Sequence, residues 1–306
     1  MIRRFALAGV FALSLAAEFG TAPPPGVPAP PATAELVRAS DLVTIQRGTL
    51  PIILSAPHGG QCRVPGSRDR VGGVTVRDDM TAELALLVAQ RITARLGQKP
   101  SFVIAQFSRK DADPNRAPGP EAYENDAAKA QYEAYHGALR ALVDEAATRT
   151  PGAILVDLHG QKREPDAIVR GTRDGKTVAR LLARAGAGAL SGPDSICGRL
   201  RHAGYTILPA LDEPATNQRH PMNEAFFDGG YIVAHYSGDP GANRADPVPN
   251  GIDAVQLEIG RMRSTETLRL ARDLGDAIAD FYQRYLTLPD PNGRQAPEVP
   301  SPSHEE

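Results

Sequence analysis

Short apolar runs that alternate with amphipathic segments constrain the fold of this chain more than any other feature. The apolar runs carry few charges, which is typical of strands buried on both faces of a sheet. They lie at residues 50–57, 101–107, 152–160, 167–171, 205–210, 229–237 and 251–260. Residues 78–97, 120–148 and 264–286 instead have apolar side chains at helical spacing. The alternation predicts an α/β fold, a three-layer α/β/α sandwich with a mostly parallel mixed sheet.

Two helix ends are marked by their residues. Gly97 follows the last periodic residue of 78–97 and is the expected C-cap, because glycine adopts the left-handed conformation at low cost. Ser264 or Thr265 is expected to cap the last helix, since a hydroxyl oxygen can accept a hydrogen bond from a free N–H of the first turn.

The two ends of the chain differ in composition from the rest. Residues 1–17 place two arginines before an apolar run and small residues, the pattern of a secretory signal peptide, with an N-terminal core helix as the alternative. Residues 18–33 are rich in proline and predict an extended linker. A second proline-rich, acidic stretch, 289–306, predicts a disordered tail. Residues 34–288 are then expected to form a single catalytic domain.

Charge and the signal peptide limit the partners and the location of the protein. The formal net charge is −2, with 34 Lys and Arg against 36 Asp and Glu, so no polyanion-binding surface and no nucleic acid partner is expected. Export predicts a periplasmic or secreted protein with no stable membrane insertion after the signal is cleaved. In that oxidising compartment Cys62 and Cys197 could form a disulfide, or stay two buried free thiols.

Three possible metal ligands stand at the ends of apolar runs or at the start of a helix. They are His58 in SAPHGG, Asp78 in RDDMTAEL and His159 in VDLHG. A catalytic zinc site takes three nitrogen or carboxylate ligands and leaves a position for water, so two histidines and one carboxylate predict a Zn²⁺ site. Asp79 is the alternative to Asp78, and Asp157 could orient His159. Either histidine could instead be a hydrogen-bonded loop residue.

Glu258 is the candidate general base and acid. It interrupts the apolar run AVQLEIG, where a lone buried carboxylate is costly without a partner. Burial would raise its pKa towards a value useful for moving a proton from water to a leaving nitrogen. Pairing with Arg261 or Arg263 is the alternative.

Several side chains could bind a substrate carboxylate. Asn115 and Arg116 lie together in SRKDADPNR, and such a pair suits capture of a carboxylate. Arg109 in the same segment and Arg170 at the end of the run 167–171 could add contacts to the substrate. Surface solvation is the alternative for each arginine.

Five short motifs, in this order, resemble those of the N-formylglutamate amidohydrolase family and cover about residues 50–262. They are Pro57-His58-Gly59-Gly60, Asp78 with Thr81, Glu83 and Leu84, Asn115-Arg116, Asp157-Leu158-His159-Gly160, and Gln256-Leu257-Glu258-Ile259. Tyr132 and His136 also look like a helix of the family. The resemblance implies a zinc-exopeptidase-like fold similar to that of carboxypeptidases and aspartoacylases.

The resemblance also implies roles for the motif residues. His58, Asp78 and His159 would hold zinc, Glu258 would be general base and acid, and Asn115-Arg116 would bind a substrate carboxylate. The chain departs from related carboxypeptidases at Gln61, where they place a ligating glutamate three residues after the first histidine.

Taken together, these features of the sequence predict a function for the chain. The chain is expected to be an exported zinc-dependent hydrolase that uses metal-activated water to cleave an amide in an N-acyl or N-formyl amino acid or a peptide-like substrate. The substrate, a small molecule or peptide, would carry a carboxylate. The alternative is a non-catalytic periplasmic binding protein that retains the hydrolase fold.

Overall fold

The structure, a computed structural model, describes residues 36–40 by their backbone, and residues 42–150, 152–210, 227–237, 248 and 251–287 in full. The predicted signal peptide 1–17, linker 18–33 and tail 289–306 lie outside the described residues. All of the described elements belong to one compact unit, Ala34–Glu306.

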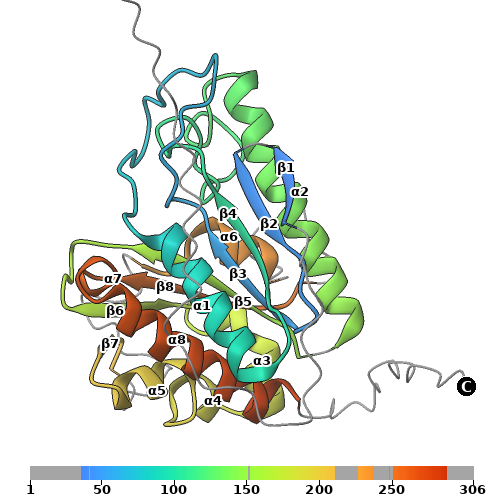
Figure 1. Cartoon of the computed structure of the whole chain (residues 1–306), viewed down its shortest axis with the longest axis vertical. Coiled ribbons are helices and arrows are strands. Elements are labelled where there is room, and N and C mark those ends of the chain that lie inside the picture. The colour runs from blue at the N-terminus through green and yellow to red at the C-terminus, as the bar shows by residue number, and fades with distance from the viewer. Residues whose placement is uncertain are drawn as a thin grey trace, which may run out of the picture. The chain divides into compact units, whose positions relative to one another are not determined.

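A mixed sheet of eight strands forms the centre of the described part of the chain (Figure 1). The strands are β1 Leu36–Ser40, β2 Val43–Gln46, β3 Ile52–Ala56, β4 Ser101–Ala105, β5 Ile154–Gly160, β6 Ala167–Gly171, β7 Thr206–Leu208 and β8 Asp253–Ile259. Their order is β1-β2-β4-β3-β5-β8-β6-β7, with β4, β3, β5 and β8 parallel to one another. Strands β2 and β6 pair antiparallel to β4 and β8 at the two sides of this parallel centre.

Helices cover both faces of the sheet, as the α/β/α prediction requires (Figure 1). They are α1 Thr81–Leu96, α2 Asp126–Arg149, α3 Ala179–Ala185, α4 Gly188–Ser191, α5 Ile196–His202, α6 Gly230–Tyr236, α7 Met262–Thr265 and α8 Thr267–Phe281, with a 3-10 turn at Lys176–Val178 and a π-helical turn at Tyr282–Leu286. Side chains of α1, α5 and α8 pack in the core on one face, and those of α2 and α6 pack in the core on the other.

Strand residues alternate between these two cores. In β3, Ile52 and Leu54 contribute to the core under α1 and α8, whereas Ile53 contributes to the core under α2. The face towards α1 and α8 is apolar along β3 and β5, and along β8 after its first residue, Asp253. On the α2 face, polar side chains replace apolar ones near the carboxyl ends of these strands, at Ser55, Asp157, His159, Gln256 and Glu258. This change in side-chain character positions the site described below.

The predicted strand at 229–237 is wrong, because residues 230–236 form helix α6. The buried Ile232, Val233 and Tyr236 lie on one helical face in the α2 core, so their spacing fits a helix better than a strand. Gly229 is the N-cap and Gly230 the first residue of the helix, with φ angles of 120° and 62°, a conformation that glycine adopts without strain.

The helix-end predictions had mixed outcomes. Gly97 is the C-cap of α1, with a φ of 69° and its N–H donating to the Thr93 carbonyl at 2.9 Å. The predicted cap at Ser264 or Thr265 is wrong, because both residues lie within α7. Helix α8 begins after Glu266, which offers no side-chain hydrogen bond to the first turn.

The described residues hold two free cysteines, Cys62, which is exposed, and Cys197, which is buried. The structure therefore has no disulfide between them, and only one of the two thiols is buried. Among the described helices, none is long and apolar enough to cross a bilayer.

Candidate metal centre and active site

His58, Asp78 and His159 come together in the structure and form a group that could hold a metal ion. One ligand atom from each lies within 4.8 Å of the other two. Oδ2 of Asp78 is 3.2 Å from Nδ1 of His58 and 3.4 Å from Nδ1 of His159. All three residues are buried. The three predicted ligands therefore converge, although they are 20 and 81 positions apart along the chain.

Local structure places each of the three side chains. His58 follows β3, and His159 lies near the carboxyl end of β5, the next strand in the sheet. Asp78 precedes α1, where its N–H donates to the His58 carbonyl at 3.1 Å. Gly60 lets this loop approach β4, because a Cβ there would lie 2.2 Å from the Gln106 carbonyl carbon.

The structure distinguishes Asp78 from Asp79 as the carboxylate of the group. The Asp79 side chain is 54% exposed and faces Arg77 at 3.4 Å. Asp78 is buried, and Thr81 at the start of α1 donates its hydroxyl to the Asp78 carbonyl at 2.8 Å. Oδ2 of Asp78 also accepts a hydrogen bond from the Gly160 N–H at 3.0 Å, which holds the carboxylate beside the two imidazoles.

A second carboxylate contacts each imidazole on its other nitrogen. Nε2 of His58 lies 2.7 Å from Oδ1 of Asp113, and Nε2 of His159 lies 2.7 Å from Oδ2 of Asp157. A carboxylate at Nε2 holds the proton there and leaves Nδ1 free to bind a cation. Asp157 was expected from the sequence. Asp113 was not, although it lies two residues before Asn115, in the segment already singled out.

The charges in this group shift its pKa values strongly. Burial favours protonated Asp78, but hydrogen bonds from His159 and His58 outweigh it and hold the pKa of Asp78 well below its usual range. The pKa of buried Asp113 is likewise lowered, by the charge and hydrogen bond of His58 and by Arg109. Burial opposes a charge on His159, yet Asp157 and Asp78 raise its pKa well above the usual value. The group thus stabilises positive charge between its carboxylates.

Glu258 lies on β8 directly beside His159 in the sheet register. It is 9% exposed, and its Oε1 accepts a hydrogen bond from Gln256 at 2.5 Å. Burial raises its pKa to about 7, although the charge of His159 acts in the opposite direction. Neither alternative partner binds it, since Arg261 pairs with Asp166, and the Arg263 guanidinium donates to backbone carbonyls.

The guanidinium groups of Arg109 and Arg116 differ in how accessible they are to a ligand. Arg109 is buried, with Nε 3.0 Å from Asp113 and Nη1 3.5 Å from Asp78, so it neutralises carboxylates of the group. The Arg116 side chain is 32% exposed, and its ion pair with Glu121 is long, at 3.6 Å. Of the two, Arg116 is the one available to an incoming anion.

Asn115 is held by its amide oxygen and lies beside His159. Its Oδ1 accepts a hydrogen bond from the Ile232 N–H in the first turn of α6 at 2.9 Å, and its Nδ2 is in contact with Nε2 of His159, at 3.4 Å. Two residues of α2 hold the adjoining backbone: Tyr132 donates to the Arg116 carbonyl at 2.9 Å, and His136 donates to the Pro114 carbonyl at 3.0 Å. These bonds orient the Asn-Arg pair.

Arg170, also predicted to contact the substrate, does not join this group. It is paired with Leu257 in the register of β6 and β8, and Leu257 belongs to the core under α1 and α8. Glu258 faces the other way, because neighbouring strand residues point to opposite faces. The whole sheet therefore separates Arg170 from the candidate metal centre.

Comparison with known proteins supports the fold assignment. No family model matches the chain, and no curated protein matches it. Among solved structures, N-formylglutamate amidohydrolase from Ralstonia eutropha matches 79% of this chain and 98% of its own, at 19% identity and a TM-score of 0.53. This chain has the N-formylglutamate amidohydrolase fold. A gene product of Agrobacterium tumefaciens matches 80% of this chain and 96% of its own, at 16% identity and a TM-score of 0.48.

The likeness to N-formylglutamate amidohydrolase confirms the resemblance seen in the motifs at the level of the fold. It extends over 98% of that hydrolase chain. The buried His58 and His159 lie at the carboxyl ends of central strands, where α/β folds collect their sites, and Asp78 joins them from the start of α1.

Proposed function

We propose that this protein is a zinc-dependent hydrolase that cleaves an amide bond in an N-acyl or N-formyl amino acid or a peptide-like substrate. The observation that carries the proposal is the convergence of two buried imidazoles and a carboxylate, with ligand atoms within 4.8 Å of one another, beside the buried Glu258. The fold that it shares with an amidohydrolase supports the same class of reaction.

The donor set fits a zinc ion. His58 Nδ1, His159 Nδ1 and the Asp78 carboxylate are the ligand types of catalytic zinc sites, and Asp113 and Asp157 supply the outer carboxylates that usually orient ligating histidines. When bound, the ion supplies a Lewis acid that polarises a carbonyl and makes water more acidic.

Glu258 would move the proton in the reaction. Its Oε1 is engaged by Gln256, which leaves Oε2 to accept a proton from the attacking water and return it to the leaving nitrogen. A pKa of about 7 suits both steps near neutral pH, because neither the loss nor the gain of a proton is then strongly uphill.

Arg116 would bind the carboxylate of the substrate. It is more exposed than Arg109, and the planar guanidinium matches a carboxylate with two parallel hydrogen bonds. Asn115 would act as a positioning residue. It contacts His159 and α6, and so holds the loop that carries both Asn115 and Arg116. Arg109 would keep the carboxylates of the group ionised.

We also propose that the protein acts outside the cytoplasm. This location is inferred from residues 1–17, in which two arginines precede an apolar run. A periplasmic or secreted enzyme of this type would act on small carboxylate-bearing amides or on peptides in that compartment.

The substitution Glu258→Gln tests the catalytic role. We expect normal zinc content and a loss of turnover of about 10²–10⁴-fold, the usual contribution of general acid–base catalysis. Zinc content and hydrolysis of formyl-amino acids, acyl-amino acids and short peptides would be measured for both proteins. Glu266→Gln, an exposed glutamate outside the site, is the matched control and should keep full activity.

Two results would contradict the proposal. Undiminished hydrolysis by Glu258→Gln would remove the assigned base. A wild-type protein that binds zinc but hydrolyses none of these substrates would favour the alternative, a binding protein with the fold of a hydrolase.

A further inference from the structure

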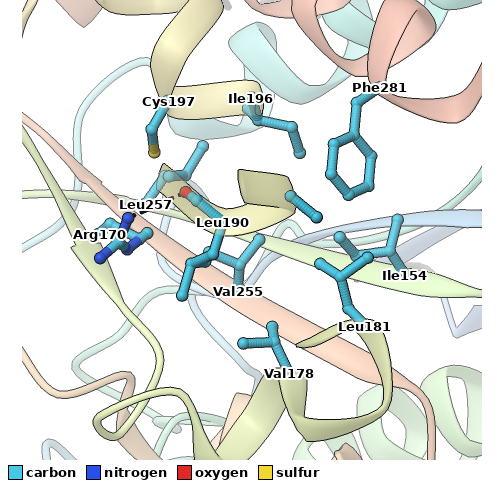
Figure 2. A pocket seen from close by; sticks show the side chains of 11 residues that line it. Ile154, Arg170, Val178, Leu181, Leu190, Ile196, Cys197, Val255, Leu257 and Phe281 are labelled. Atoms are coloured by element: carbon cyan, nitrogen blue, oxygen red, sulfur yellow. Dashed lines mark hydrogen bonds between the residues drawn. The ribbon is translucent and has the colours of Figure 1, made fainter. Parts of the chain in front are cut away.

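A small cavity lies on the other side of the sheet from the candidate metal centre (Figure 2). Its volume is about 20 Å³, which is room for about one water molecule or one small ion. Apolar side chains from β5, β8, α3, α4, α5 and α8 form most of the wall. Arg170 and Cys197 are the exceptions, and Figure 2 shows both at the same end of the cavity, away from Phe281.

The Arg170 guanidinium is buried in this wall, and the described residues meet only part of its hydrogen-bonding capacity. Arg170 is 4% exposed. Its Nη1 donates to the Leu190 carbonyl of α4 at 3.0 Å, whereas its buried Nε–H has no hydrogen-bond partner among the described residues. A buried donor without a partner costs free energy, and a guanidinium stays charged under all ordinary conditions.

The carboxylates nearest to Arg170 in the sheet do not neutralise it. Glu258 and Asp157 point to the opposite face. Asp253 points to the same face but is four residues along β8 from Leu257, the register partner of Arg170, a separation of about 13 Å. Asp253 also has partners of its own, the Leu181 N–H at 2.9 Å and Arg184 at 3.7 Å. The ion pairs of the described residues include none with Arg170.

Cys197 does not supply the negative charge. Its thiol is buried, and burial raises its pKa, although Arg170 acts in the opposite direction. A neutral thiol leaves the charge of the guanidinium without a compensating charge among the described residues.

We propose that the cavity beside Arg170 is a binding site for a small monovalent anion of halide size, with chloride as the abundant candidate. The positive charge of Arg170 and its Nε–H, which has no partner in the part of the chain that the structure describes, match one negative charge. Because apolar walls do not replace the water around an anion, they discriminate against strongly hydrated anions such as fluoride, and the small volume excludes phosphate or sulfate. The anion would link β6 to α4 and α5 and stabilise the fold. This inference is independent of the proposed hydrolase function.

Thermal unfolding of the full chain tests this site. Wild type would be compared in sodium chloride, bromide, fluoride and gluconate at constant ionic strength. We expect a saturable rise in the midpoint of roughly 2–4 °C or more with chloride or bromide. Fluoride, which is strongly hydrated, and gluconate, which is too large, should give no such rise.

Three variants locate the effect. Arg170→Met removes the charge but keeps an apolar chain of similar length, so the response to chloride should disappear. Ala189→Val reduces the cavity and leaves Arg170 in place, and it should weaken or abolish the response. Arg272→Met, at an exposed position, should respond like wild type. A wild-type midpoint that does not depend on chloride, or an undiminished response in Arg170→Met, overturns the proposal.

Crystals of wild type soaked in bromide keep the proposal testable if both cavity variants fail to fold. An anomalous peak beside Nε of Arg170 is the expected result. A water molecule at that position, or bromide only elsewhere, overturns the proposal.

Discussion

At the scale of single residues, the notable feature is that each imidazole of the site lies between two carboxylates. His58 lies between Asp78 and Asp113, and His159 between Asp78 and Asp157. The carboxylate at Nε2 fixes the tautomer, so Nδ1 is the atom available to a metal ion. Four buried groups thus surround the shared Asp78, and the loss of either imidazole would remove one contact from each of the two carboxylates beside it.

The substitutions His58→Ala and His159→Ala test the ligand assignment. We expect each variant to lose bound zinc, because two ligands do not retain the ion as three do. Zinc content would be measured after dialysis and compared with that of His202→Ala, which changes an exposed histidine. Stoichiometric zinc in either of the first two variants would contradict the assignment.

The substitution Arg116→Ala tests substrate recognition. Arg116 is proposed to bind the substrate carboxylate, so its loss should raise KM by about 10–100-fold, the usual range for one charge-assisted contact, with zinc content unchanged. Steady-state kinetics would be measured with an acyl-amino acid, which carries the carboxylate, and with its uncharged amide. The variant should discriminate less than wild type between these two substrates. An unchanged KM for the acid would contradict the role, and Arg272→Ala serves as the exposed control.

At the scale of secondary structure, strand β8 contributes to both sides of the sheet. Its residues Gln256 and Glu258 lie on the side of the candidate active site, and Val255 and Leu257 lie in the opposite core. Its first residue, Asp253, faces that core and accepts a hydrogen bond from the Leu181 N–H, so it acts as a remote cap for the first turn of α3. Burial raises the pKa of Asp253 to about 6 from an ordinary value of 3.8.

This raised pKa predicts a pH dependence of stability. Between pH 4 and 6 the folded chain keeps a proton on Asp253 that the unfolded chain has lost, so this residue makes the free energy of unfolding fall as pH rises through that window. The loss should be on the order of 2–3 kcal/mol in total.

Urea unfolding of wild type and Asp253→Asn from pH 4 to pH 7 measures the contribution. The difference between the two proteins should shift in favour of the variant as pH rises, because asparagine does not ionise. A difference that stays constant with pH would contradict the prediction.

At the scale of the whole molecule, the sheet separates two sites of different character. The candidate metal centre lies on the α2 face at the carboxyl ends of β3, β5 and β8, and the Arg170 cavity lies on the face of α1 and α8. The candidate metal ligands come from segments far apart in sequence, so only the folded chain can offer them together. Binding of a metal ion at this group would therefore be thermodynamically linked to folding.

This linkage predicts that zinc raises the unfolding temperature of the protein. At a free zinc concentration about 1,000 times the Kd, stability should rise by about 4 kcal/mol, or on the order of 10 °C. Calorimetry with zinc and with a chelator would measure the shift, and His58→Ala should abolish it. An unfolding temperature that does not respond to zinc would contradict a metal centre at this position.

Much of the fold followed from sequence periodicity. Six of the seven predicted strands and the helices α1 and α8 lie within the predicted ranges, and α2 ends one residue beyond its range, because long apolar patterns outweigh local propensity. The exception was 229–237, a short apolar run in which a strand and about two turns of helix look alike. Contacts of Ile232, Val233 and Tyr236 with the α2 core, and the cap from Asn115, decide in favour of the helix.

The sequence by itself determined which residue types stand at strand ends, and so it identified His58, His159 and Glu258 as candidates. Only the tertiary structure decided which of them meet. Strand order brings the ends of β3, β5 and β8 together. The hydrogen bond from the Gly160 N–H holds the Asp78 carboxylate in the group, whereas Asp79 faces Arg77. The alternation of β6 turns Arg170 to the far face of the sheet. Periodicity is a local property of the chain, whereas proximity depends on how separate strands pair, and short motifs do not encode that pairing.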